Sequence, residues 1–240
     1  MRYAIFADVH ANLEALAAVF DALEQQAPDE CVCVGDLVGY GADPEACVDL
    51  VRAHGCLCVA GNHDHAALGC ADTSEFNLYA RESAAWTGRN ISKQTAAYLA
   101  RLGFVEHAPE AVFVHGSLDS PESFSYIQTV RDAQRNLALL DKPLLFCAHS
   151  HIPVAFLGTE PPTYSLDAHI GLEQGVPTIV NVGSVGQPRD EEPRAAYAIY
   201  DTEAAAVHMH RVPYDVDTAS RKILDAGLPE ILAQRLRTGN

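Results

Sequence analysis

Gly61-Asn62-His63-Asp64 is the stretch around which the rest of this sequence is organised. It follows Cys56-Leu57-Cys58-Val59-Ala60, whose small and β-branched apolar residues predict a buried strand. That strand would end in an amide, an imidazole and a carboxylate, which together can ligate an ion, transfer a proton and orient the imidazole. The same four residues also suit a tight turn, so a functional interpretation depends on related residues elsewhere in the chain.

Four other apolar stretches end in similar residues. The predicted strands are 3–7, 31–34, 111–114 and 144–147, and they are followed by Asp8/His10, Asp36, His115 and His149/His151. Functional crevices of open α/β sheets lie outside the carboxyl ends of the strands, so we expect these side chains to converge. Oxygen and nitrogen ligands without thiolate favour ions such as Mn, Fe, Zn, Ni or Co over a structural zinc cage.

Local alternatives exist for single residues. Asp8 and His10 are two positions apart and share one side of an extended segment, whereas Asn12 is the predicted N-cap of the following helix. Asp36 has no such capping role, because Asp43-Pro44 supplies a better start for the next helix, to about residue 53.

Composition limits the kind of protein and partner. With 240 residues, 48% of them hydrophobic, the chain is predicted to form a single domain over residues 1–240. A formal net charge of −16 argues against binding to duplex nucleic acid or to an anionic membrane, whereas a nucleotide-sized substrate stays possible if metal ions reverse the charge locally. Six of the seven cysteines lie in apolar runs and, with no signal sequence, predict reduced thiols in a cytoplasmic protein.

Residues 68–102 are predicted to form a helical insertion. The segment contains the only Trp, and its aromatic residues recur at loose helical spacing. It directly follows the opening tetrapeptide, so it could cover the site and determine specificity, although aromatic side chains at such spacing are more often part of a core.

The five motifs together resemble a known family. Asp8-x-His10, Gly35-Asp36, Gly61-Asn62-His63-Asp64, His115-Gly116 and His149-x-His151 match, in order and spacing, the motifs of calcineurin-like metallophosphoesterases over residues 1–190. The resemblance is strongest to small bacterial phosphodiesterase-type members, which also carry a late segment like Gly183-Ser184. Ala148 departs from the usual glycine, but alanine tolerates most backbone conformations, so no loss of metal is expected.

The resemblance implies a fold and a metal site. The fold would be a four-layer α/β sandwich of two mixed sheets. Asp8, His10 and His151 would hold one divalent ion and Asn62, His115 and His149 a second, with Asp36 bridging them. Mn is the expected ion, with Fe, Zn, Ni or Co as alternatives. Two such ions can activate a bridging hydroxide for attack on phosphorus. His63 would protonate the leaving alkoxide, and Asp64 would hold its ring.

The substrate expected from these residues is a phosphodiester or a cyclic nucleotide. The protein phosphatase branch of the family carries a G-D-x-x-D-R-G motif, but here Gly39 and Tyr40 stand at the second aspartate and the arginine. Tyr40 and Arg189 are the predicted substrate contacts, although Arg189 could be an exposed turn residue. The alternatives are a phosphomonoesterase, a protein phosphatase, a dinucleoside polyphosphate hydrolase and, less favoured, a non-catalytic scaffold of the same fold.

Overall fold

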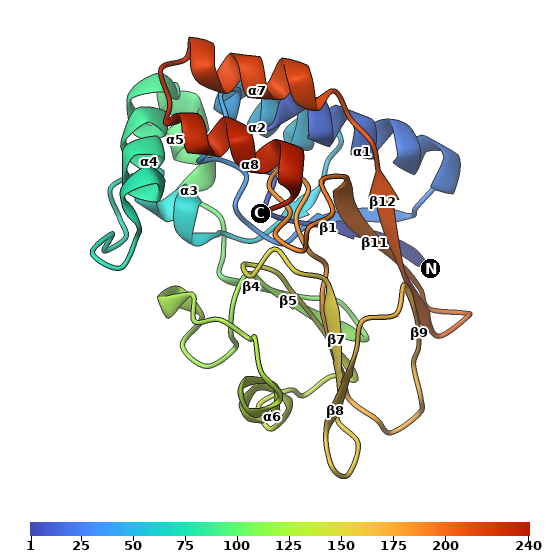
Figure 1. Ribbon diagram of the computed structural model, residues 1–240. Helices are drawn as coiled ribbons and strands as arrows, with labels where there is room; N and C mark the ends of the chain where they lie inside the picture. Colours follow the sequence, from blue (N-terminus) through green and yellow to red (C-terminus); the bar gives the residue numbers. More distant parts are fainter.

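Two six-stranded mixed sheets form the centre of the computed structural model, which describes all 240 residues (Figure 1). In order, the first sheet contains β3 (Leu57–Cys58), β2 (Glu30–Cys33), β1 (Arg2–Phe6), β11 (Ala195–Asp201), β12 (Ala206–Val212) and β9 (His169–Gly171). The second contains β4 (Val105–His107), β5 (Ala111–Val114), β6 (Leu144–Cys147), β10 (Thr178–Asn181), β7 (Val154–Leu157) and β8 (Thr163–Ser165).

Three apolar clusters hold the layers together. Side chains such as Ile5 and Phe113 fill the space between the two sheets. The outer face of the first sheet is covered by α1 (Leu13–Gln26) and α2 (Pro44–Ala53), and that of the second by α6 (Val130–Leu137). Figure 1 shows α6 on the opposite side of the sheets from α1 and α2, which completes the predicted four-layer sandwich.

A fourth apolar cluster packs one helix of the segment after residue 68 and the two C-terminal helices around Tyr40. The segment after residue 68 contains α4 (Leu78–Asn90) and α5 (Lys93–Leu99), and the chain ends in α7 (Val216–Asp225) and α8 (Glu230–Thr238). Tyr40, Ala80, Ile223 and Leu232 are buried together in this cluster, so the C-terminal helices pack close to the loop that follows β2. None of the helices is long and apolar enough to span a bilayer.

Strand direction brings the predicted site residues to one edge. β1 pairs in parallel with β2 and β2 with β3, while β5 pairs in parallel with β6. The carboxyl ends of these strands therefore point the same way within each sheet, and the loops that follow them lie next to each other. Asn12 caps α1 as predicted, because its side chain accepts a hydrogen bond from the Ala15 amide.

Some elements differ from the sequence-based prediction. The tetrapeptide opens a short helix, α3 (Asn62–Ala67), with Gly61 at its N-cap. Its Asn-His-Asp-His run has low helix propensity, so periodicity gives no signal there. Residues 158–177 contain the short strands β8 and β9, and α8 was not predicted. All seven cysteines are free thiols, of which only Cys70 is exposed.

Candidate metal centre

Seven candidate ligands converge from the loops that follow five strands. Asp8 and His10 come after β1, Asp36 after β2, Asn62 from the start of α3, His115 after β5, and His149 and His151 after β6. All seven are buried, with at most 7% of any of them exposed. Polar groups so deeply buried need partners, and a cation would supply them.

Two trios of ligand atoms form separate groups. Asp8, His10 and His151 offer one set and Asp36, His115 and His149 another, and within each set all ligand atoms lie within 4.8 Å of one another. Each trio combines residues from both sheets, because Asp8, His10 and Asp36 follow strands of the first sheet and the others follow strands of the second.

Asp36 belongs to the second trio but also approaches the first. Its Oδ2 is 3.7 Å from His10 Nε2 and 3.3 Å from His115 Nε2. Asn62 belongs to the second trio, because its Oδ1 is 3.1 Å from His115 Nε2. Asp36 therefore lies within reach of both groups and Asn62 beside the second, and their roles as bridge and ligand stay predictions.

The unpaired atoms at the centre fit bound cations. Asp8 Oδ1 and Asp36 Oδ2 are buried and have no hydrogen-bond partner. His10 Nε2 lies 3.1 Å from His151 Nε2, and His115 Nε2 lies 3.2 Å from His149 Nδ1. Oxygen and nitrogen lone pairs held this close repel each other unless a proton or a metal ion lies among them, so the donor set suits divalent metal.

Backbone carbonyls fix the orientation of three imidazoles. The Nδ1–H of His10 donates to the Val38 carbonyl at 3.1 Å, and that of His115 donates to the Val34 carbonyl at 2.8 Å. His151 Nδ1–H donates to the Gln187 carbonyl at 2.5 Å. In the neutral form of each ring the Nε2 lone pair then faces the centre, which is the tautomer a metal requires.

Strained backbone surrounds the centre. Five of the seven candidate ligands have positive φ, between 49° and 71°; they are Asp8, His10, Asp36, His149 and His151. Non-glycine residues rarely adopt this region, and each costs of order 1–3 kcal/mol unless the surroundings compensate. The rest of the fold must therefore hold these loops in place.

Burial and charge set the protonation of the metal-free centre. Burial lowers the pKa values of His10, His149 and His151, which favours their neutral form. For His115, burial opposes protonation, but the Asp36 carboxylate raises its pKa to about 9. Without metal, a proton on His115 would offset the negative charge of Asp36, which is the role that a bound cation would otherwise have.

Asp64 does not contact the His63 ring. Its carboxylate accepts hydrogen bonds from the backbone amides of Asp36, Val38 and Gly61 at 3.0–3.1 Å. The expectation that Asp64 orients the imidazole is therefore wrong, because the amides at the start of α3 and in the loop after β2 take up both of its oxygens. Asp64 instead fixes the backbone of Asp36.

Aromatic rings hold His63 in place of a carboxylate. Its ring centroid is 4.3 Å from that of Tyr40 and 4.9 Å from that of Phe76, and its buried Nδ1 has no hydrogen-bond partner. Gly39 lies against this nitrogen, since a Cβ added there would be only 2.5 Å from it. Burial lowers the pKa of His63 to about 4.

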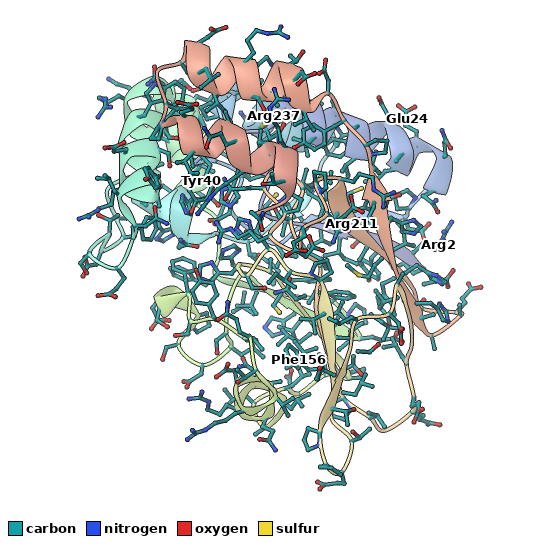
Figure 2. The ribbon with its side chains drawn as sticks, in the orientation of Figure 1. Arg2, Glu24, Tyr40, Phe156, Arg211 and Arg237 are labelled. Atoms are coloured by element: carbon teal, nitrogen blue, oxygen red, sulfur yellow. The ribbon has the colours of Figure 1, made fainter.

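A cleft of about 520 Å³ opens from the centre. Asn62, His63 and His149 lie at its inner end, and Tyr40 and Arg189 also line it. Arg189 is half-buried and donates to the Tyr40 hydroxyl at 3.3 Å and to Gln187 Oε1 at 3.0 Å, so it is not a free turn residue. Figure 2 shows Tyr40 beside α3 and below α8.

Sequence patterns did not reveal three other residues of this cleft. Phe124 and Tyr126 lie in a segment without regular periodicity, and Phe76 lies in the predicted helical insertion but outside its helices; their proximity to His115, His149 and His63 connects them to the centre. The sequence predicted that the segment after the tetrapeptide could cover the site, but it did not single out Phe76 within that segment.

Comparison with known proteins identifies phosphoesterases as relatives of this chain. Residues 1–205 match the model of the calcineurin-like phosphoesterase superfamily domain. An uncharacterized protein of Methanocaldococcus jannaschii is 36% identical over 98% of this chain and 97% of its own length. The crystal structure of a metallophosphoesterase from Sphaerobacter thermophilus is 37% identical, with a TM-score of 0.88 over 100% of this chain and 99% of that one. A hypothetical protein from Pyrococcus horikoshii shares the fold, with a TM-score of 0.81 at 19% identity over 100% and 98% of the two chains.

Proposed function

This chain belongs to the calcineurin-like phosphoesterase superfamily, which indicates a metal-dependent hydrolase of phosphoesters. Within that class, we propose that it hydrolyses phosphodiesters, including cyclic nucleotides. The observation that carries the proposal is the shortage of fixed positive charge around the cleft. Arg189 is the only lysine or arginine among its lining residues. A monoester dianion carries one more negative charge than a diester and needs more cationic side chains to bind it.

The proposed metal ligands are the two trios together with Asn62. Asp8, His10 and His151 would hold one divalent ion, and Asn62, His115 and His149 the other, with Asp36 shared. When bound, such ions act as Lewis acids on phosphoryl oxygens and activate water near neutral pH. We propose Mn on the basis of the mixed oxygen and nitrogen donors, with Fe, Zn, Ni or Co as alternatives.

His63 is the proposed proton donor to the leaving alkoxide. It lines the inner end of the cleft next to Asn62, and none of its ring atoms is needed by either trio. In the metal-free protein burial lowers the pKa of His63 to about 4, which favours the neutral imidazole at pH 7. The negative charge of a bound phosphodiester favours the imidazolium form, so substrate binding itself would help to protonate it.

Tyr40 and Arg189 are the proposed contacts to substrate. They are hydrogen-bonded to each other and both line the cleft close to His63. One guanidinium and one phenol can satisfy the single negative charge and the neutral ester oxygen of a diester.

A pair of chromogenic substrates tests the proposal. With Mn present, kcat/KM should be higher for bis-p-nitrophenyl phosphate than for p-nitrophenyl phosphate, and a 2′,3′-cyclic nucleotide should be opened. A clear preference for the monoester would instead establish a phosphomonoesterase.

A further inference from the structure

The outer part of the cleft is built from two chain segments with similar chemistry. The connection between α3 and α4 contributes Asp72, Glu75 and Phe76. The segment between β5 and α6 contributes Glu122, Phe124 and Tyr126. Each segment therefore brings carboxylate together with an aromatic ring to the same cavity.

The rings continue outward from the metal centre. Tyr126 stacks on His149 with ring centroids 3.8 Å apart and an interplanar angle of 11°, yet 46% of the residue is exposed, which leaves its other face open to the cleft. Phe76 also lines the cleft and contacts His63, with ring centroids 4.9 Å apart. A group attached to a phosphate at the centre would therefore meet aromatic surface.

The carboxylates of this region have no cationic partner within the protein. Asp72, Glu75 and Glu122 are exposed and none takes part in an ion pair. Arg189, the only lysine or arginine of the cleft, is held at its inner end near Tyr40, Gln187 and the hydroxyl of Tyr126, and not beside the three carboxylates. The inner end of the same cleft reaches Asn62 and His149, next to the unpartnered and fully buried Oδ2 of Asp36.

Aromatic faces combined with carboxylates recognise one class of group. The π face attracts an ammonium ion, and quaternary ammonium groups are bound in this way. A second phosphate group would meet three carboxylates in the same space and be repelled. The cleft is thus polarised, with an anion-binding inner end and a cation-favouring outer end.

We propose that the outer cleft binds an ammonium group carried by one alcohol of the phosphodiester substrate, with Asp72, Glu75 and Glu122 supplying the charge and Phe76, Phe124 and Tyr126 the surface. This proposal rests on the phosphodiesterase function proposed above. It also predicts that dinucleoside polyphosphates are poor substrates, because their additional phosphates would enter this acidic region.

Two esters of equal shape isolate the effect of charge. p-Nitrophenyl phosphocholine and p-nitrophenyl 3,3-dimethylbutyl phosphate share a leaving group and differ only in a quaternary nitrogen replaced by carbon. We expect kcat/KM to be about fivefold or more higher for the choline ester, the size of effect that a cation gains from rings and carboxylates in a partly exposed site. In Glu75→Gln/Glu122→Gln this ratio should fall towards one.

A variant far from the cleft provides the control. Glu24 is an exposed acid on α1, and Figure 2 shows it well away from Tyr40. Glu24→Gln removes negative charge from the surface as well, so an effect of total charge alone would change the ratio in this variant too. We expect the wild-type ratio in Glu24→Gln.

Binding without metal separates this proposal from the proposed reaction. In EDTA-treated protein, saturation-transfer NMR should detect choline but not its neutral analogue 3,3-dimethylbutanol, and the double variant should lose the choline signal. If no diester is hydrolysed while choline binding follows this pattern, the subsite stands and the reaction is wrong. If diesters are hydrolysed but the two esters and the two alcohols behave alike, or if the double variant keeps the preference, the cation subsite is wrong.

Discussion

His63 illustrates how single residues shape this site. In the absence of a carboxylate partner, its ring is fixed by Tyr40 and Phe76 and by the missing side chain of Gly39. Packing restricts the ring but leaves Nδ1 without a partner, and burial outweighs the attraction of the Asp36 carboxylate, so the pKa of His63 is lowered. The proposed acid would therefore depend on the charge of the substrate for its protonation.

Removing this imidazole should affect chemistry and leave the metals in place. His63→Ala is expected to lose about 10²–10⁴ of kcat on an alkyl phosphodiester, the usual contribution of a positioned proton donor. The loss should be much smaller on bis-p-nitrophenyl phosphate, because nitrophenolate leaves without a proton. Equal losses on both substrates, with metal content unchanged, would contradict the acid role.

Phe76 should act through the same ring. In Phe76→Ala the imidazole loses one of its three ring contacts, which are to His10, Tyr40 and Phe76, so we expect a smaller decrease in kcat with the same dependence on the leaving group. Phe104→Ala is a matched control, since Phe104 contacts His65 and Phe124 but not His63. A loss in Phe76→Ala that is the same for good and poor leaving groups would argue against a positioning role.

The positions of the candidate metal ligands depend on the loops that follow the strands more than on the strands themselves. Close backbone contacts lock them together: a Cβ on Gly61 would lie 2.0 Å from Asp36 Oδ1, and one on Gly186 would lie 1.9 Å from the Val9 carbonyl. Asp36 and Asp8 have left-handed backbone, and Gly61 packs against Asp36 while the Gly186 amide donates to the Asp8 carbonyl at 2.9 Å. Gly61→Ala should therefore displace Asp36 and lower the metal content, as measured by elemental analysis.

The end of α1 offers a test of backbone strain that is independent of the site. Ala27 follows the helix with φ of 46° and its amide donates to the Leu23 carbonyl, a position that favours glycine. Ala27→Gly should raise the free energy of unfolding by about 0.5–1 kcal/mol. Ala18→Gly, within the same helix, should lower it by about 1 kcal/mol. Thermal unfolding of both variants would show opposite shifts, and a destabilised Ala27→Gly would contradict the argument.

The sequence predicted the strands and the convergence of their ends, because apolar runs followed by Asp, His or Asn are visible without any tertiary information. The roles of individual polar groups were less predictable. Asp64 turned out to bind three backbone amides of distant loops, and the aromatic contacts of His63 and His149 come from irregular segments. Such contacts depend on how loops pack in three dimensions, which periodicity does not encode.

Considered as a whole, the molecule would be cross-linked by its metal centre. Each trio takes ligands from loops of both sheets, so a bound ion would connect the two halves of the sandwich. A ligand that binds only the folded state stabilises it by about 2.7 kcal/mol at a hundredfold excess over its Kd. Removal of metal with EDTA should therefore lower the unfolding temperature by roughly 5–10 °C for a chain of this length, and Mn should restore it.

The central claim is that Asp36 holds two ions at once, and metal stoichiometry tests it most directly. Its Oδ2 is unpartnered and lies within 3.7 Å of a histidine nitrogen from each trio. Inductively coupled plasma mass spectrometry of the Mn-loaded protein should find two ions per chain, with Asp49→Asn, a change on the exposed face of α2, as the control. We predict that Asp36→Asn lowers the occupancy of both ions together. Two ions per chain retained in Asp36→Asn, or a single ion in the wild-type protein, would contradict the account.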